Sequence, residues 1–424
     1  MALIVIAVFV LALLIGLPMF IVLGLTCLAY FLLNDISPLM IVQRMFVGLD
    51  GFVTMAVPLF ILAGNLMNTG GALDRLVKFA NVVVGHVRGG LAQVNVLGSM
   101  FFAGISGAAT ADVAALGPLE VKAMTDSGYE KDFATALTVA SATLGPLIPP
   151  SLHMVIYGVT VSQSIGALFM AGVVPGILLG LAMMVQVDYF AKKYNFPKGS
   201  RPSLKLLAKE FIRAIGPLGL PAIIVLGIFT GFFTPTEAAA MACLYAFIIG
   251  KFVYKELTWR NLPKVFLDTG IICAGSMLIV AISNCFSWVI AIENIPQIVT
   301  EFLLSITSNK YILLLLINIG LLILGCFMEG VSAIIITAPI LVPAVMALGV
   351  DPIHFGLIMN LNITLGLLTP PMGLSLFIAS SFTKLPVTRI ARKTMPFFLM
   401  MVGLLLIFTF VPEITMFLPN LLTK

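Results

Sequence analysis

Two proline-containing stretches hold the backbone groups with which this chain could bind an ion. They read Gly145-Pro-Leu-Ile-Pro-Pro-Ser151 and Gly366-Leu-Leu-Thr-Pro-Pro-Met372, and each lies inside a long apolar segment. Consecutive prolines remove backbone donors and cannot continue a regular helix, so each segment is predicted to break near the middle of a membrane. A broken helix exposes carbonyl and amide groups, which bind ions without the burial of a full protein charge. The pattern therefore predicts ion binding by unwound backbone.

Both stretches belong to an internal repeat with a constant spacing. Thr143-Leu-Gly matches Thr364-Leu-Gly, and 364 − 143 = 221. The same offset also pairs Gly104 with Gly325, Pro118 with Pro339, and Gly128 with Gly349. Two interrupted apolar segments at corresponding positions of two halves indicate a secondary-transporter site at the interface between the repeats.

The composition places the whole chain in a membrane. Of its 424 residues, 60% are hydrophobic and 10% are charged, with a mean hydropathy of +1.15, whereas soluble proteins are about 45–50% apolar. The net charge of +5 is explained by basic residues in short loops between spans, so no nucleic-acid partner is predicted. The sequence has no P-loop signature, which excludes ATP coupling within this chain.

The segments around the two stretches predict an all-α polytopic membrane protein with two related repeats. Each repeat combines a re-entrant helical hairpin, rich in small residues that permit close helix approach, with a broken transmembrane helix. The first repeat is predicted over 89–190, with its hairpin at 99–124 and its broken helix at 133–158. The second is predicted over 310–394, with its hairpin at 325–347 and its broken helix at 355–382.

The remaining segments are predicted to form a scaffold around these repeats. Residues 1–88 supply scaffold spans and end in a charged arm helix at 72–88. Residues 191–309 supply further spans and cytoplasmic loops, and residues 395–424 form a C-terminal span.

Basic loops set the expected orientation. The loop 192–213 carries seven basic residues against one acid, so it is predicted to be cytoplasmic, as is the basic loop 251–264. Counting spans from these loops makes the broken helix 133–158 run outward and 355–382 run inward, so the repeats are inverted. The same count leaves three basic residues of the arm on the outer side or flat in the interface: Arg75, Lys78 and Arg88.

Three motifs of the first half resemble one transporter family. They are Val84-Gly-His-Val-Arg-Gly-Gly-Leu-Ala-Gln-Val-Asn-Val96, Phe102-Ala-Gly-Ile-Ser-Gly-Ala-Ala-Thr-Ala-Asp112 and Thr143-Leu-Gly-Pro-Leu-Ile-Pro-Pro-Ser151. With the second-half segments 325–330 and 364–372, they make the chain similar over essentially its whole length to the large membrane subunit of tripartite ATP-independent periplasmic (TRAP) transporters.

The resemblance implies an elevator-type importer of small organic acids that is coupled to sodium and lies, as a multi-pass protein, in the lipid bilayer of the bacterial inner membrane. Familiar substrates of the family are sialic acid and C4-dicarboxylates. Two partners are implied, a periplasmic substrate-binding protein and a small membrane subunit of about four spans. The small subunit is expected as a separate polypeptide. The alternative is a proton- or sodium-coupled organic-anion transporter that works without a binding protein.

Two or more sodium sites are expected, with one at each break. Sodium prefers several oxygen ligands, which backbone carbonyls at a break supply together with a few hydroxyls. The candidates for the second site are Gly325, Thr364, Gly366, Thr369 and Met372. Subtracting 221 gives the first site, which comprises Gly104, Thr143, Gly145, Ile148 and Ser151, with Ser106 nearby. The alternative is that these glycines and prolines only permit kinks and close packing.

Four polar side chains are candidates for substrate binding or coupling: Asn95, Asp112, Glu329 and Asn362. A carboxylate buried in a membrane is costly and by default indicates a function. The alternative for Asp112 and Glu329 is that each caps a short hairpin helix through backbone amides. The three histidines, His86, His153 and His354, match no carboxylate pattern, so no proton relay is predicted.

Two other classes of protein, an intramembrane enzyme and a passive channel, fit the sequence less well. An intramembrane enzyme would need an acid pair, which Asp112 and Glu329 could imitate, but the sequence contains no HExxH motif and no nucleophile with a base. A passive channel has little need for two broken-helix repeats with deep hairpins. The sequence therefore predicts a secondary transporter and not an enzyme.

Overall fold

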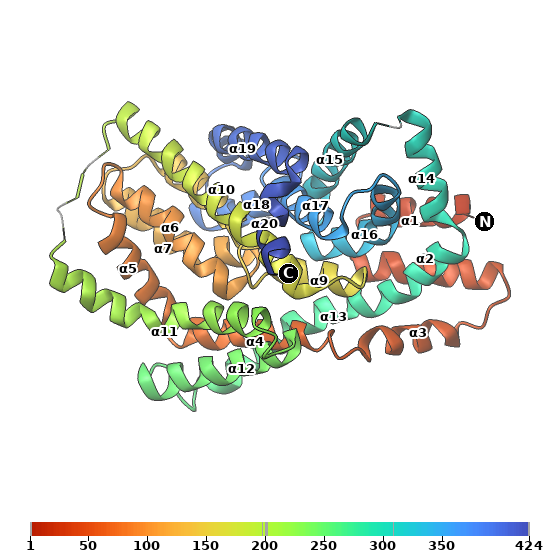
Figure 1. Cartoon of the computed structure of the whole chain (residues 1–424), viewed down its shortest axis with the longest axis horizontal. Helices are drawn as coiled ribbons and strands as arrows, with labels where there is room; N and C mark the ends of the chain where they lie inside the picture. Colours follow the sequence, from red (N-terminus) through yellow and green to blue (C-terminus); the bar gives the residue numbers. More distant parts are fainter. Residues whose placement is uncertain (1, 197, 200–201, 308, 423–424) are drawn as a thin grey trace.

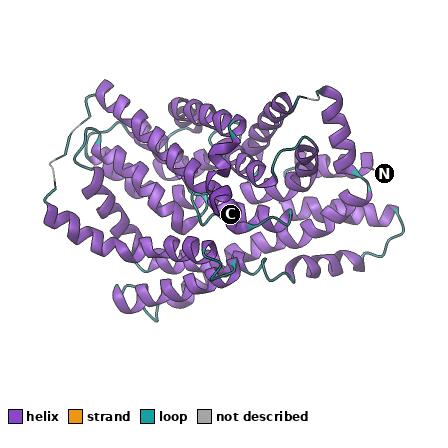
Figure 2. Ribbon diagram, in the orientation of Figure 1, coloured by secondary structure: helices purple, strands orange, loops and turns teal. Residues whose placement is uncertain are grey.

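The protein is helical throughout the part that the structure describes. The computed structural model describes residues 2–196, 198–199, 202–307 and 309–422. Within these ranges the chain forms helices joined by short connections, and the only extended pairing is an isolated bridge between Arg88 and Lys198 (Figure 1, Figure 2). The predicted all-α class is confirmed.

Seven helices in the described ranges are long and apolar enough to cross a membrane. They are α10 (Ile165–Lys193), α11 (Leu204–Phe229), α12 with its π-helical end (Pro235–Val253), α13 (Leu262–Ile292), α15 (Lys310–Phe327), α16 (Gly330–Ala347) and α19 (Val387–Phe410). A bent pair, α4 (Ala56–Thr69) and α5 (Ala72–Val84), passes the same criterion with a 69° angle between its halves. The protein is therefore a multi-pass membrane protein.

The two hairpins obey the 221-residue offset. The first consists of α6 (Gly90–Ser106) and α7 (Ala109–Asp126), and the second consists of α15 and α16. Adding 221 to the limits of α7 gives 330–347, which are the limits of α16. The predicted hairpins at 99–124 and 325–347 fall inside these pairs, although each first arm begins earlier than the glycines indicated.

The two broken helices obey the same offset. The first is α8 (Lys131–Ser141), continued by a 3₁₀ turn (Ala142–Leu144) and, after the break at 145–151, by α9 (Leu152–Thr160). The second is α17 (Pro352–Gly366), followed by a break at 367–373 and by α18 (Leu374–Thr383). Before each broken helix the chain turns at a glycine in the left-handed region, Gly128 with φ of 88° and Gly349 with φ of 72°.

The repeat also extends into the scaffold. The arm helix α5 has a counterpart in α14 (Ile295–Ile306), and both follow a residue in the left-handed region, Gly71 in one half and Asn294 in the other. The long helix α10 after the first broken helix corresponds to α19 after the second. A final helix, α20 (Pro412–Leu422), follows α19. The predicted C-terminal span at 395–424 is therefore interrupted, because α19 ends at Phe410.

Contacts between the repeats show that they run in opposite directions. Asp132 at the start of α8 pairs with Arg389 at the start of α19. At the other end, the Tyr157 hydroxyl of α9 donates to the carbonyl of Pro352, 2.6 Å away, where α17 begins. The first broken helix therefore ends where the second begins, which is the inverted arrangement that the sequence predicted.

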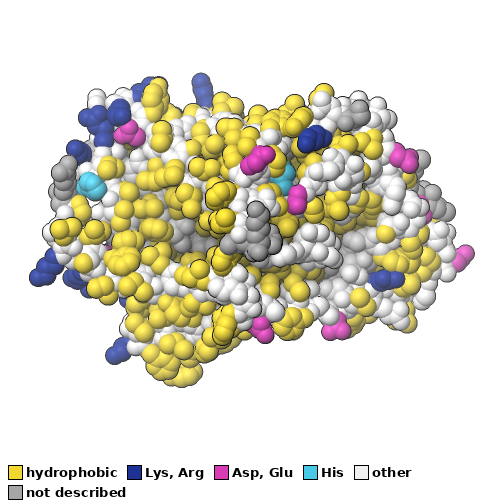
Figure 3. All heavy atoms as spheres, viewed as in Figure 1, with side chains coloured by type: hydrophobic (Ala, Val, Ile, Leu, Met, Phe, Trp, Pro, Cys, Tyr) yellow, Lys and Arg dark blue, Asp and Glu magenta, His cyan; other side chains and the backbone are white. Residues whose placement is uncertain are grey.

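The arm helix α5 lies on the side of the basic loops. Arg75 pairs with Glu256 at 2.7 Å, and its guanidinium stacks on Tyr254 at 3.7 Å from the ring centre. Just beyond the helix, the backbone of Arg88 forms an isolated antiparallel β-bridge with that of Lys198. Lys and Arg side chains gather along this edge, at the left of Figure 3. The positive-inside rule places these basic residues on the cytoplasmic side. Of the two expected placements of the arm, a position flat in the interface therefore fits, and the outer side does not.

The N-terminal segment folds back on itself before the scaffold continues. Its first 33 residues form two helices that contact each other, α1 (Ala2–Leu14) and α2 (Met19–Leu33), with Gly16 in the left-handed region between them. The next helix, α3 (Leu39–Leu49), packs along α13.

Candidate functional site

The tip of the first hairpin is seated on the first break. Gly107, with φ of 65°, joins α6 to α7, and a Cβ built on it would lie 2.7 Å from the carbonyl oxygen of Pro150. The amide of Leu152 donates to the carbonyl of Gly107 at 3.3 Å. Only a residue without a side chain fits this contact, so the tip and the break form one backbone-lined site.

Asp112 brings a buried carboxyl group to this site. Its side chain is 1% exposed, and one carboxylate oxygen accepts a hydrogen bond from the Ser106 hydroxyl. The other oxygen, Oδ2, has no hydrogen-bond partner among the described residues and would lie 2.7 Å from a Cβ placed on Gly145. A buried oxygen without a partner is costly, and a cation placed between Asp112 and the broken backbone would remove that cost. The helix cap of α7 is Ala108, which has no side-chain capping bond, so the capping interpretation of Asp112 finds no support.

The other first-site candidates differ in where their polar groups point. Gly104 lies near the carbonyl of Pro149, and the Ser151 hydroxyl accepts the Met154 amide at 3.3 Å as the cap of α9. The Thr143 hydroxyl donates to the carbonyl of Ala140 at 2.7 Å, inside its own helix. The Ile148 side chain packs toward Gly176 of α10. Ser106, Asp112 and Gly145 are therefore the groups that the fold brings together.

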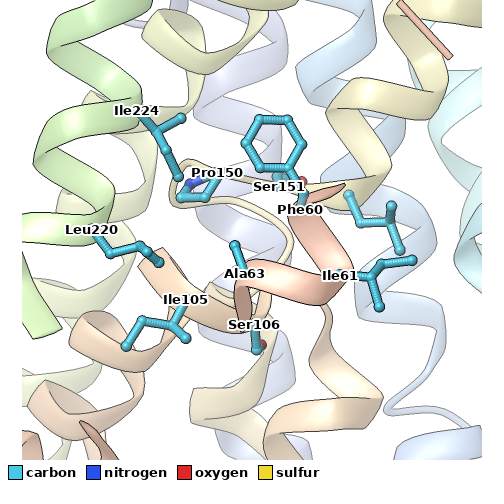
Figure 4. A pocket seen from close by; sticks show the side chains of 10 residues that line it. Phe60, Ile61, Ala63, Ile105, Ser106, Pro150, Ser151, Leu220 and Ile224 are labelled. Atoms are coloured by element: carbon cyan, nitrogen blue, oxygen red, sulfur yellow. The ribbon is translucent and has the colours of Figure 1, made fainter. Parts of the chain in front are cut away.

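A narrow pocket separates this site from the scaffold. Phe60 and Ala63 of α4 line one side and Leu220 and Ile224 of α11 another, while Ser106 and Ser151 supply its hydroxyl groups (Figure 4). Most of the lining is apolar, so the polar groups that meet a bound species come from the hairpin and the break.

The second break is packed against the second hairpin by two glycines. A Cβ on Gly366 would lie 2.4 Å from the carbonyl carbon of Gly325, and a Cβ on Gly325 would lie 2.7 Å from the carbonyl oxygen of Ile363. The Thr369 hydroxyl donates to the carbonyl of Gly366 at 2.8 Å and lies 2.7 Å from the sulfur of Cys326. Gly325, Gly366 and Thr369 thus come together, as predicted for the second site.

A second pocket, with about 510 Å³ of empty volume, opens at this tip. Its lining includes Gly325, Cys326, Glu329 and Met372, and the Met372 side chain is 55% exposed. Thr364 is not part of it, because its hydroxyl donates to the carbonyl of Asn360 one turn earlier in α17, at 2.7 Å. The second site is therefore more open than the first.

Glu329 has two roles in this arrangement. Its Oε2 accepts the amides of Val331 and Ser332 at 3.0 and 3.4 Å, so it caps α16 as the capping interpretation expected. Its Oε1 lies 3.9 Å from Nε2 of His153 on α9. No carboxylate pattern in the sequence indicated this approach of Glu329 to His153.

Asn95 and Asn362 belong to polar clusters below the tips. Asn95 of α6 donates to Glu120 of α7 at 2.7 Å and to Thr138 of α8 at 2.6 Å, and its oxygen accepts the Ser141 hydroxyl at 2.8 Å. Asn362 donates to Asn318 of α15 at 2.8 Å. Both asparagines tie a hairpin to a broken helix, and Asn362 Oδ1 has no hydrogen-bond partner among the described residues.

Sequence reasoning missed Glu120, His153, Asn318 and Cys326. Glu120 and Asn318 carried a usable signal, because each is a polar residue inside a predicted membrane hairpin. His153 and Cys326 carried little, since only the tertiary contact reveals their partners.

Comparisons with known proteins identify the family. The family model described as "Tripartite ATP-independent periplasmic transporter, DctM component" matches residues 5–414. The chain belongs to this family. As a DctM component it is a transport permease and not an enzyme.

Permease proteins named for different substrates are similar to this chain over most of its length. It is 41% identical over 411 residues to the sialic acid TRAP transporter large permease protein SiaM of Vibrio cholerae, covering 96% of this chain and 95% of that protein. It is 41% identical over 377 residues to the C4-dicarboxylate TRAP transporter large permease protein DctM of Pseudomonas aeruginosa, with coverages of 89% and 88%. The isethionate TRAP transporter permease protein DctMQ of Oleidesulfovibrio alaskensis is 40% identical over 411 residues, which span 96% of this chain and 65% of that protein.

Two solved structures share the fold. The YdaH transporter of Alcanivorax borkumensis superposes with a TM-score of 0.63 at 15% identity, covering 88% of each chain. MtrF of Neisseria gonorrhoeae superposes with a TM-score of 0.62 at 13% identity, covering 91% of this chain and 85% of that one. The DctM chain therefore has the architecture of these transporters.

Proposed function

We propose that this chain is the large membrane subunit of a sodium-coupled importer of small organic acids in the bacterial inner membrane. The observation that carries the proposal is the inverted pair of sites in which a hairpin tip is seated on a broken helix. Such sites expose backbone oxygens and helix ends at membrane depth, where coupling ions and anionic substrates bind in secondary transporters.

Sodium is the coupling ion that best fits the side chains present. The first site offers Asp112 Oδ2, buried and without a partner among the described residues, beside the backbone of Gly145. The second offers carbonyls around Gly366 and the Thr369 hydroxyl. Hard oxygen ligands of this kind suit a small alkali cation, and the two sites provide places for two sodium ions.

An elevator movement is favoured by the contrast between two kinds of contact. The repeats are joined to each other by polar bonds, including Asp132 to Arg389 and Asn360 to Pro146. The first hairpin meets the scaffold through small and apolar groups, with Gly64 against the backbone of Ile105. A core held together by polar bonds can slide as one body along an apolar scaffold surface.

The names of the relatives guide the choice of substrate and partners. Sialic acid and C4-dicarboxylates are the substrate classes to test, because relatives named for each are about equally similar to this chain. A periplasmic binding protein is proposed to deliver the substrate, and a small membrane subunit to complete the scaffold. The longer DctMQ relative, of which this chain spans 65%, supports an additional membrane part.

The test is reconstitution with and without the two proposed partners. Uptake of labelled sialic acid and a labelled C4-dicarboxylate is measured in proteoliposomes under an inward sodium gradient. We expect uptake only when the chain, the small subunit and the binding protein are all present, since substrate is delivered and the scaffold completed by the partners. Equal uptake by the chain alone would support the alternative transporter that works without a binding protein.

A further inference from the structure

A chain of polar contacts, buried at Asn360 and His153, joins the first break to the second hairpin. It begins at Pro146 in the first break, whose carbonyl oxygen accepts a hydrogen bond from Asn360 Nδ2 at 2.6 Å. Asn360 lies on α17 of the other repeat and is 1% exposed. Because Pro146 lies next to Gly145, this contact fixes the backbone against which Asp112 Oδ2 rests.

The next member of the chain is His153 on α9. Its Nδ1 lies 2.9 Å from Asn360 Oδ1, and its side chain is buried. An amide oxygen only accepts, so Nδ1 carries a hydrogen and donates it to Asn360. The Asn360 amide is thus fixed on both sides, because its Nδ2 donates to the carbonyl of Pro146 and its Oδ1 accepts from the His153 ring.

The chain ends at the tip of the second hairpin. His153 Nε2 faces Glu329 Oε1 at 3.9 Å, while the other oxygen of Glu329 caps α16. The ring also packs directly on Gly330, because a Cβ there would lie 2.2 Å from His153 Cε1. A displacement of His153 therefore moves or frees the start of α16.

We propose that Asn360 and His153 couple the first ion site to the position of the second hairpin tip. The inference rests on the proposed function, because it concerns the two ion sites named there. Sodium bound between Asp112 and the first break fixes the backbone around Pro146, Asn360 and His153 transmit that geometry, and Glu329 with Gly330 closes on the second site. Asn360 and His153 are positioning residues. Two sites that bias one movable element in this way have a coupling free energy, and the coupling is reciprocal.

Cys326 supplies a native reporter for the second tip. It lines the pocket there, is partly exposed, and contacts Thr369. In a full-length chain whose other four cysteines are alanine, the rate at which a maleimide labels Cys326 is measured in liposomes. Sodium is varied against choline at constant ionic strength, and the concentration that halves the labelling rate is recorded.

The coupling predicts a non-additive result. Asp112→Asn, which alters only the first site, is expected to raise the half-protective sodium concentration by about five- to 150-fold, the usual range for coupled sites. Asn360→Leu and His153→Phe break the chain at different links and are each expected to raise it to a similar level. Adding Asp112→Asn to either background is then expected to change nothing further.

A matched control separates this chain from cross-repeat contacts in general. Tyr157→Phe removes another hydrogen bond between α9 and α17, at the outer end of both helices, and is expected to leave the half-protective concentration and its response to Asp112→Asn unchanged. The use of two chain-breaking variants keeps the test decisive if one of them fails to fold.

The labelling experiment separates failure of the coupling from failure of the proposed second sodium site. If Asp112→Asn shifts the concentration by the same factor in the parent, Asn360→Leu and His153→Phe backgrounds, or shifts it in none of them, the coupling is refuted while sodium binding at the second site stands. If sodium does not protect Cys326 even in the parent chain, both the coupling and the proposed second sodium site are refuted.

Discussion

Asp112→Asn is expected to raise the sodium concentration for half-maximal uptake by about tenfold or more in the complete transporter. The substitution keeps the size of the side chain and an oxygen that accepts the Ser106 hydroxyl, but it removes the charge beside Gly145. A lost bond to a charged group is worth about 1.5–3 kcal/mol, and each 1.4 kcal/mol is tenfold in affinity. Uptake rates against sodium concentration in proteoliposomes provide the measurement.

Asp351→Asn is the matched control for this loss of charge. Asp351 caps α17 by accepting the amides of Ile353 and His354, and it lies away from both breaks. Asparagine caps a helix about as well as aspartate, so this variant is expected to retain the parent sodium curve. If Asp112→Asn has the same dependence of uptake on sodium concentration as the parent, the Asp112 carboxylate is not a sodium ligand.

Gly366→Ala is expected to destabilise the protein by disturbing the packing of α15 against α17. The new Cβ would lie 2.4 and 2.5 Å from backbone carbon atoms of Gly325 and 2.9 Å from the Cys326 amide nitrogen. Because these are backbone atoms of two packed helices, the helices must separate, and overpacking of this kind costs about 1–3 kcal/mol or more. The thermal midpoint and the monodispersity of the purified protein in detergent are expected to fall.

Gly320→Ala tests the same chemical change without the clash. Gly320 lies in α15, and no atom lies within 4 Å of a Cβ built on it. Alanine is a better helix former than glycine by about 1 kcal/mol, so the midpoint is expected to stay or rise. A Gly366→Ala protein as stable as this control would contradict the close approach of α15 and α17.

The offset of 221 residues predicted much of the fold because the signals that carry it are local. Prolines that break a helix and glycines that permit a left-handed turn act on their own backbone. That is why the limits of α7 and α16 agree residue for residue, and why Gly128 and Gly349 share a conformation.

Other features of the site depend on choices that the local sequence leaves open. Thr143 and Thr364 were predicted beside the ions, but a threonine in a helix can also bond to a carbonyl of the preceding turn, and both do so. The partnership of His153 with Glu329 joins residues from opposite repeats, which periodicity does not reveal.

Uptake by the complete transporter under separate sodium and proton gradients tests the central claim most directly. Proteoliposomes that contain the chain, the small subunit and the binding protein are given either an inward sodium gradient at equal pH or a pH gradient in choline buffer. The account predicts accumulation of the labelled acid with sodium alone, because the groups at both breaks are oxygen ligands for a cation. Accumulation driven by the pH gradient without sodium would contradict it.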